Sequence, residues 1–260
     1  MKRILLLALV VLAINANAKV RVISDFDDTI KRSNIVNGGS RTAGRAILFY
    51  KAYRAMPELF QEMINNSEGL YVLSASPGIV GPIIKATLKS YHIPYLDIFT
   101  RDLDEIGSEE KKIAYKLESI ESVLNENPED DLILLGDNIE ADHKVYLKVV
   151  QRNPSKVLSI YIRKVFNTEL PSGVDGFYTA FEVAAKEFER GRLNLKQVKR
   201  VADKILDTKK HRMYRLIPYY AYCPVEPNEF SATNSADLKQ MEKEIILKVS
   251  DYCKLRESLL

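Results

Sequence analysis

Acidic residues follow two apolar segments of the chain, and their types and spacing suit phosphate chemistry. Asp25 and Asp27 follow the run 20–24, and Asp137 follows the run 132–135. A phosphate monoester is a dianion, so an attacking carboxylate is repelled unless a cation lies between the two. Mg²⁺ is such a cation, because it binds carboxylate and phosphate oxygens. We therefore expect Asp25 and Asp137 to hold Mg²⁺, and Asp25 to attack phosphorus and form an aspartyl-phosphate.

Four further polar side chains could complete such a site. Asp27, two residues after the expected nucleophile, can act as general acid and then as general base for a water molecule. Ser74 can donate a hydrogen bond to a phosphoryl oxygen, and Lys116 can neutralise both Asp25 and the phosphate. Asp142 is expected to brace either the metal ligands or Lys116.

The elements that must position these residues alternate between strands and helices. Short apolar runs predict the strands 20–24, 70–73, 94–100, 132–135, 157–163 and 176–179. Apolar residues at helical spacing predict the helices 43–64 (divided at Pro57), 79–91, 109–125 and 139–151. This alternation indicates a doubly wound, Rossmann-like α/β domain with a parallel sheet. Ligands bind beyond the carboxyl ends of the strands in such sheets, which is where the polar residues stand.

In chain order, these residues resemble the motifs of the haloacid dehalogenase-like (HAD) phosphohydrolases. The matching elements are D-x-D-x-T at 25–29, Ser74, Lys116 and the Gly-Asp pair at 136–137. The resemblance implies a HAD-type sheet and Mg²⁺ as the cofactor. It also implies that the backbone carbonyl of Asp27 is a further metal ligand and that Thr29 has a supporting role.

A longer series of motifs resembles the catalytic domain of phosphatidate phosphatases of the actin-patch-protein type. The series covers about 20–181, and its parts are the segments 24–31, 74–77, 136–142 with Tyr146, and 160–163. The position of Lys116 before the strand at 132 also fits this family, which favours it over Lys111 and Lys112. The match implies a supporting role for Glu140 and a substrate contact for Ser76.

Departures from this family pattern weaken the substrate assignment more than the chemistry. They are Tyr115 in place of His, Gly78 in place of an aromatic residue, and Ile139 in place of Gly. Arg163, at the end of the strand 157–163, has two interpretations. It binds the phosphate, carboxylate or glycerol group of a lipid substrate, or it forms an ion pair with Glu140 or Asp142.

The short connections between the expected elements leave no room for a large cap domain. HAD enzymes choose substrates largely through such caps, and an uncapped site suits a bulky substrate. We therefore expect the substrate to be phosphatidate or a related lipid phosphate. Two alternatives stay open: a broad-specificity periplasmic phosphatase for nucleotides or sugar phosphates, and an inactive HAD-fold module that binds lipid or protein. The quartet Asp25, Asp27, Lys116 and Asp137 argues against the inactive module, which has no need of all four.

The N-terminal residues have the pattern of a secretory signal peptide. Lys2 and Arg3 precede the apolar run 4–14, and the small residues at 16–18 suit cleavage. This run is too short to span a bilayer, which takes about 20 residues. We expect a removed signal at 1–18, a mature chain from Lys19 and a periplasmic or secreted location. A buried N-terminal strand or helix is the alternative.

The last part of the chain is predicted to be helical and basic. Strand alternation stops near residue 190, so we place the catalytic domain at 19–190 and a C-terminal extension at 191–260. An apolar stripe at 195, 198, 202 and 205 either packs on the main domain or, with the Lys and Arg around it, contacts an anionic membrane. The net charge of only +3 gives no support for nucleic-acid binding.

The chain has two cysteines, Cys223 and Cys253, and both lie in the extension. In an oxidising compartment they could form a disulfide that ties the extension together. Two buried free thiols are the alternative.

Overall fold

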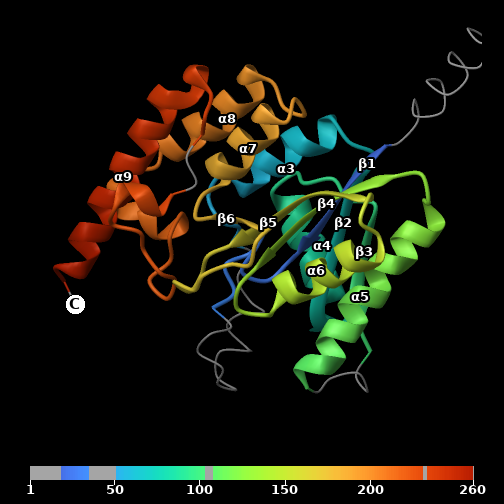
Figure 1. The fold of residues 1–260 in the computed structure, drawn as a ribbon. Coiled ribbons are helices and arrows are strands. Elements are labelled where there is room, and N and C mark those ends of the chain that lie inside the picture. Colours follow the sequence, from blue (N-terminus) through green and yellow to red (C-terminus); the bar gives the residue numbers. More distant parts are fainter. Residues whose placement is uncertain (1–18, 35–50, 103–107, 231–232, 260) are drawn as a thin grey trace, which may run out of the picture.

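A parallel β-sheet forms the centre of the protein (Figure 1). The computed structural model describes residues 19–34, 51–102, 108–230 and 233–259. Within them the sheet has six strands: β1 (Val20–Asp25), β2 (Gly69–Pro77), β3 (Asp97–Arg101), β4 (Asp131–Asp137), β5 (Val157–Arg163) and β6 (Asp175–Phe177). Their order is β3-β2-β1-β4-β5-β6, and all neighbours are parallel. The predicted doubly wound sheet is confirmed.

The central strands carry apolar residues on both faces, because helices cover both faces of a parallel sheet. Successive side chains of a strand point to opposite faces. In β1, Val22 accordingly packs into one core cluster and Ile23 into the other. In β4, Ile133 and Leu134 divide in the same way.

The helices change face between β1 and β4. Helices α3 (Met56–Asn65) and α4 (Gly81–Ser90) pack into the cluster that contains Val22. Helices α5 (Glu109–Glu126) and α6 (Asp142–Arg152) pack into the cluster that contains Ile23. The chain therefore winds outward from β1 in both directions. Doubly wound sheets bind their ligands at such a switch point, beyond the carboxyl ends of the strands.

The observed helices differ from the predicted ones mainly at their starts. Residues 43–50 of the first predicted helix lie outside the described residues, and α3 begins at Met56 with Pro57 in its first turn. A proline fits there because it has no N–H to leave unpaired. Helix α6 begins at Asp142 instead of 139, since Ala141 before it has a positive φ of 62°.

In the described part of the chain, no cap domain interrupts the sheet. Between β2 and α5 it has only a single 3₁₀ turn (Gly78–Val80), α4 and β3. Within the described residues, this arrangement agrees with the predicted fold without a large cap. The predicted signal peptide at 1–18 lies outside the described residues, as do 35–50 and 103–107.

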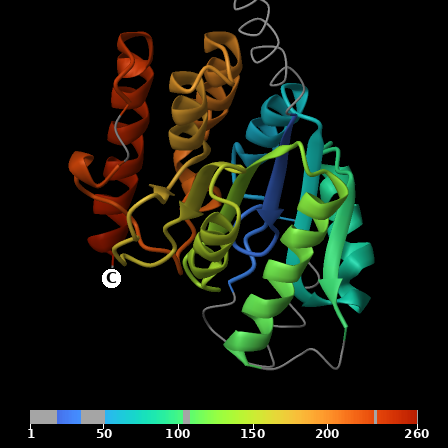
Figure 2. The same cartoon turned by 45° about the vertical axis from the view of Figure 1, so that its right-hand side comes forward.

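The C-terminal extension packs against the same face of the sheet as α3. Helix α7 (Ala180–Glu189) contacts α8 (Leu195–Leu206), and α8 contacts both α3 and α9 (Lys239–Glu257). Figures 1 and 2 show α9 outside α8, away from the sheet. Buried residues of α8 and α9 belong to the core cluster that contains Val22. In the predicted stripe, Val198, Ala202 and Ile205 are buried, whereas Leu195 is 42% exposed.

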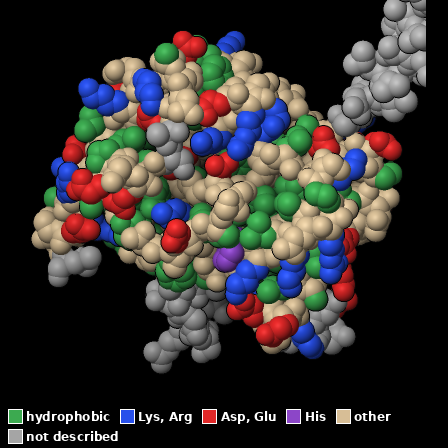
Figure 3. All heavy atoms as spheres, viewed as in Figure 1, with side chains coloured by type: hydrophobic (Ala, Val, Ile, Leu, Met, Phe, Trp, Pro, Cys, Tyr) green, Lys and Arg blue, Asp and Glu red, His purple; other side chains and the backbone are tan. Residues whose placement is uncertain are grey.

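Several basic residues of the extension form ion pairs with neighbouring acids. On α8, Lys199 pairs with Asp203, Arg200 with Glu62 and Lys204 with Glu58. On the face shown in Figure 3, Lys and Arg side chains lie among Asp and Glu side chains. None of the described helices is both long and apolar enough to cross a membrane.

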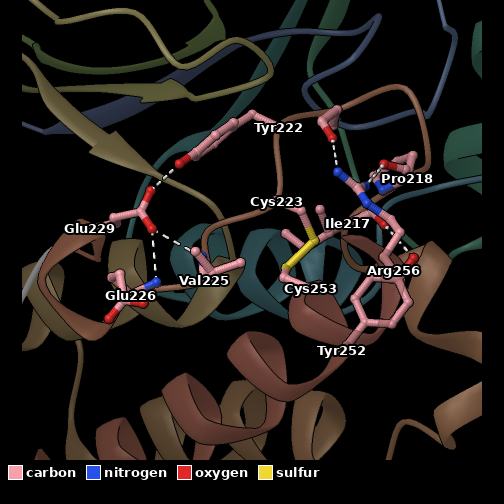
Figure 4. The surroundings of a disulfide bond; sticks show 11 residues. Ile217, Pro218, Tyr222, Cys223, Val225, Glu226, Glu229, Tyr252, Cys253 and Arg256 are labelled. Atoms are coloured by element: carbon pink, nitrogen blue, oxygen red, sulfur yellow. Dashed lines mark hydrogen bonds between the residues drawn. A yellow bond between two sulfur atoms is a disulfide. The ribbon is translucent and has the colours of Figure 1, made fainter. Parts of the chain in front are cut away.

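A disulfide joins the two cysteines of the extension (Figure 4). Cys223 follows the 3₁₀ helix Lys210–Arg215, and Cys253 lies in α9. Both are buried. The bond ties the segment before Cys223 to the outermost helix, and it resolves the alternative that the sequence left open.

Candidate active site

Buried polar residues gather at the carboxyl ends of the three central strands. Asp25 is the last residue of β1 and lies opposite Leu73 of β2, the neighbour of Ser74. Asp137 is the last residue of β4, which pairs with the other side of β1. Asp25, Ser74 and Asp137 have no exposed surface. The sheet therefore brings together three residues that lie far apart in the sequence.

Lys116 lies at the centre of the acidic group. Its Nζ donates to Asp25 Oδ1 at 2.8 Å and to Asp142 Oδ1 at 2.5 Å, and it lies 3.6 Å from Glu140 Oε2. The lysine is 1% exposed and reaches the cluster from α5. Of the lysines that competed in the sequence, Lys112 pairs with Glu140 at 2.8 Å and Lys111 is exposed. The geometry thus places Lys116 against Asp25.

The turn between β4 and α6 is built around Asp142. Its Oδ2 accepts the backbone N–H of Asp137 at 3.1 Å. A Cβ on Gly136 would lie 2.5 Å from Asp142 Oδ2, so a side chain at 136 would displace this carboxylate. Asp137 Oδ1 in turn accepts the N–H groups of Ile139 (2.6 Å) and Glu140 (3.2 Å). These bonds aim the second oxygen of Asp137 at the cluster.

The acidic group fits a divalent cation. Carboxylate oxygens of Asp25, Asp137 and Asp142 lie within 4.8 Å of one another. Asp25 Oδ2 and Asp137 Oδ2 are buried and have no hydrogen-bond partner in the described part of the chain. Buried carboxylate oxygens without partners are costly unless a cation binds them, and Mg²⁺ prefers oxygen ligands. Asp25 and Asp137 were both predicted from the sequence as metal ligands, and metal binding by them stays a prediction.

Burial governs the electrostatics of the cluster. It raises the pKa of Asp25 well above its ordinary value, against the opposing effect of the Lys116 charge. Burial and the neighbouring Asp142 likewise raise the pKa of Asp137. For Lys116, burial lowers the pKa, but Asp142 and Asp25 outweigh it, and the net pKa lies well above the usual range. For Asp25 and Asp137, the effect of burial thus exceeds the stabilisation of their charged forms by Lys116.

Asp27 lies apart from this cluster, among hydroxyl groups. Its Oδ2 accepts from Ser76 Oγ at 3.1 Å and from Ser74 Oγ at 3.4 Å. Its Oδ1 accepts from Ser33 Oγ and lies 3.9 Å from Lys31 Nζ. The carboxylate is thus not a member of the metal group, which contains Asp142 as its third acid. The predicted metal contact through the Asp27 carbonyl stays a prediction.

Arg163 does not form either of the ion pairs that the sequence offered. Its guanidinium is buried, lies 3.9 Å from the centre of the Tyr53 ring and 4.7 Å from that of Phe177. It donates to the carbonyls of Tyr178 (3.0 Å) and Thr29 (3.4 Å). Burial lowers the pKa of this arginine. The bond to Thr29 supports the backbone of the loop 26–33 that follows β1, called the catalytic loop below, and substrate binding by Arg163 stays a prediction.

Sequence reasoning missed the residues that hold the loop after Asp27. Asp28 has a φ of 53°, and its Oδ1 accepts the N–H of Ser33 at 3.0 Å. The same oxygen accepts from Tyr53 OH at 3.3 Å and from Tyr220 OH at 2.5 Å. Tyr220 comes from the extension, 192 residues away. No local pattern signals such a contact. Thr29, predicted to support the site, contributes its carbonyl to Arg163.

Fold, site and sequence comparison together define the class of this protein, an α/β phosphatase. The chain belongs to the family described as phosphatidate phosphatase APP1, catalytic domain, whose family model matches residues 20–164, more than half of the chain. This match confirms the resemblance stated from the motifs. The extension that supplies Tyr220 lies beyond it.

Individual relatives are distant. The uncharacterized protein C29B5.04c of Schizosaccharomyces pombe (strain 972 / ATCC 24843) is 24% identical over 154 residues, which are 57% of this chain and 26% of that protein. The chain thus spans about a quarter of the length of this relative.

The similar solved structures are also distant. A structure of the Pnkp1/Rnl/Hen1 complex is 15% identical in sequence, with a TM-score of 0.41. The match covers 56% of this chain and 47% of that chain. The structure of phosphoserine phosphatase from T. onnurineus, in complex with NDSB-201, is 12% identical in sequence, with a TM-score of 0.36. The match covers 61% of this chain and 88% of that chain. TM-scores at this level do not establish a shared fold.

Proposed function

We propose that this protein is a Mg²⁺-dependent phosphomonoester hydrolase that works through an aspartyl-phosphate on Asp25. The observation that carries the proposal is the state of the Asp25 carboxylate. One oxygen is held by Lys116 at 2.8 Å, and the other is buried and without a hydrogen-bond partner in the described structure. A carboxylate that Lys116 fixes in place is oriented both for a cation and for attack on phosphorus.

In the first step, a carboxylate oxygen of Asp25 bonds to phosphorus, and the bond from phosphorus to the ester oxygen breaks. Asp27, protonated at this stage, gives its proton to the leaving oxygen. In the second step, Asp27 takes a proton from water, whose oxygen attacks phosphorus, and the carboxylate of Asp25 leaves as the intermediate breaks down. Ser74 and Lys116 bind the phosphoryl oxygens. A bound Mg²⁺ supplies positive charge between Asp25, Asp137 and the phosphate.

The substrate that we propose is phosphatidate or a related lipid phosphate. The name of the matching family supports a lipid phosphate, and so does the lack of an inserted cap domain in the described residues. Hydrolysis of soluble nucleotides or sugar phosphates is the second candidate, because an uncapped site does not exclude them. A signal peptide at 1–18, a mature chain from Lys19 in the periplasm or outside the cell, and the boundary near residue 190 remain part of the proposal. The disulfide is compatible with such an oxidising compartment.

Hydrolysis of p-nitrophenyl phosphate tests the reaction. We expect activity that needs Mg²⁺ and is lost in EDTA and in Asp25→Asn. An Asp25→Asn variant as active as the wild type would exclude the mechanism. Rates on phosphatidate in mixed vesicles, compared with rates on soluble nucleotides, decide the substrate class.

A further inference from the structure

A basic cavity of about 340 Å³ lies beside the catalytic loop. Its volume is in the range of about 300–1,000 Å³ that ligand pockets occupy. Five parts of the chain form it: the loop after β1, the residues that lead into α3 and its first turn, the end of α4, α8 and the 3₁₀ helix Lys210–Arg215. Part of its wall, including Tyr214 and Arg215, lies beyond the residues that the family model matches.

The charges that line the cavity are mostly positive. The basic residues are Arg32, Lys51, Arg54, Lys204 and Arg215. The described lining contains a single carboxylate, that of Glu58. Glu58 is neutralised by Lys204 at 2.7 Å. In the described part of the chain, Arg32, Arg54 and Arg215 form no ion pair with any acid. Half-buried arginines without counter-charges repel one another unless an anion lies between them.

The arginines are held in place by other contacts. Arg32 donates through Nε to the carbonyl of Ala52 and through Nη1 to that of Tyr214, both at 3.3 Å. Its guanidinium lies 5.5 Å from the centre of the Tyr214 ring. Arg54 donates through Nε to the Lys204 carbonyl at 3.0 Å. Each of these guanidinium groups keeps further N–H donors, so the cavity is prepared for an acceptor with several oxygens.

The cavity is also close to the catalytic loop. Arg32 directly follows Lys31, which forms bridges with both Asp27 and Ala52. Neighbouring Cα atoms are about 3.8 Å apart, so the backbone of Arg32 lies only a few ångströms beyond that of the loop. Tyr53 lines the cavity, and its hydroxyl donates a hydrogen bond to Asp28 of the catalytic loop.

We propose that this cavity binds a phosphate group other than the one that is hydrolysed. The guanidinium groups of Arg54 and Arg215 supply the paired donors that phosphate oxygens accept. The tyrosine rings that line it can cover an attached organic group. The phosphate belongs either to the headgroup of a membrane lipid or to a free soluble ion, since the chemistry of recognition is the same.

Calorimetric titration of the full chain with inorganic phosphate tests the site. The titration is made in EDTA, where the buried carboxylates of the catalytic cluster repel the ion. We expect Arg54→Gln/Arg215→Gln to weaken phosphate binding by roughly tenfold or more, because charge-assisted hydrogen bonds are lost. The control Lys196→Gln/Lys243→Gln removes the same charge from exposed positions and should bind as the wild type does.

A second arm identifies the source of the phosphate. Sedimentation with phosphatidylcholine vesicles that contain phosphatidylglycerol is compared for the same variants. Loss of both vesicle binding and inorganic phosphate binding in the cavity variant supports a lipid headgroup, and loss of inorganic phosphate binding alone supports a soluble ion. If the cavity variant binds both probes as its control does, the proposal is overturned. Arg215→Glu provides the same comparison through charge reversal if the double variant does not fold.

Discussion

At the scale of single residues, the site depends on charge compensation by Lys116. This side chain is 1% exposed and contacts Asp25 and Asp142, both fully buried. Removing one partner of a buried ion pair leaves the other charge without compensation, which costs about 3–5 kcal/mol. The lysine is therefore needed for stability as well as for the phosphate binding that we propose for it.

We expect Lys116→Met to lower the free energy of unfolding by about 3–5 kcal/mol and to abolish phosphatase activity. Urea unfolding in EDTA measures the first effect without a bound metal. Lys111→Met, on the same helix but exposed, is the control and should change stability by less than about 0.5 kcal/mol. Equal stability of the two variants would show that the buried carboxylates do not need the Lys116 charge.

Gly136 is predicted to be required because its missing side chain leaves space for Asp142. In Gly136→Ala, the new Cβ would lie 2.5 Å from Asp142 Oδ2, and the carboxylate must move. We expect a loss of about 1–3 kcal/mol in stability, typical of overpacking, together with weaker Mg²⁺ activation. Gly81→Ala is the matched control, since nothing lies within 4 Å of a Cβ there. A Mg²⁺ titration of activity compares the two variants, and similar curves would contradict the argument.

At the scale of elements, the extension completes the support of the catalytic loop. The Tyr220 hydroxyl donates to Asp28 at 2.5 Å, and the neighbouring Tyr53 donates to the same oxygen. Asp28 follows Asp27 directly and has a positive φ, a conformation that needs support when the residue is not glycine. Tyr220 is therefore a positioning residue that acts through Asp28.

Tyr220→Phe should reduce kcat several-fold and leave KM nearly unchanged, because the loop moves while the phosphate contacts remain. A hydrogen bond to a charged group contributes about 1.5–3 kcal/mol, so some stability is lost as well. Tyr219→Phe is the control, since that ring is 72% exposed. A loss of stability in Tyr220→Phe with normal kcat would reduce its role to a structural one.

The acid Glu229 gives the extension a dependence on pH. Burial raises its pKa, but the hydroxyl of Tyr222 and the N–H groups of Glu226 and Val225 outweigh this and hold the pKa below its ordinary value (Figure 4). Because the pKa of Glu229 is lowered in the folded protein, its carboxylate stabilises the fold fully above the ordinary pKa of 4.5. This stabilisation is lost as the pH falls through the pKa of the folded state.

Glu229→Gln should therefore lower Tm at pH 7, and the difference from the wild type should shrink as the pH falls below 4.5. Thermal unfolding at several pH values measures this. Glu118→Gln, at an exposed position on α5, should show no such trend. A constant difference across the pH range would mean that the charge of Glu229 has no part in stability.

The strands, and the position of Asp25 and Asp137 at strand ends, could be predicted because both depend on local patterns. An apolar run that ends in an acid, such as 20–25, predicts both a buried strand and the residue at its carboxyl end. The contact of Tyr220 with Asp28 could not be predicted, because it joins positions 192 residues apart and no spacing rule connects them. The sequence also could not decide the surroundings of Arg163, since stacking on Tyr53 depends on how the loop and β5 meet.

At the scale of the whole molecule, the extension and the sheet form one folding unit. Val249 and Cys253 of α9 belong to the same core cluster as Val22 and Val72 of the sheet. Residues that share a core unfold together, because exposing one side of the core exposes the other. A disulfide in the extension should therefore stabilise the catalytic half as well.

Cys223→Ala/Cys253→Ala should lower the stability of the whole chain in a single transition. The disulfide closes a loop across a sequence separation of 30, for which chain entropy gives about 3–4 kcal/mol. Urea unfolding, followed in parallel by circular dichroism and by loss of phosphatase activity, should give coincident curves shifted to lower urea. In the presence of a reductant the wild type should approach the variant, which serves as the control for the substitutions themselves. Two separate transitions, with activity surviving the first, would show that the extension folds independently of the sheet and that the support of Asp28 by Tyr220 is dispensable.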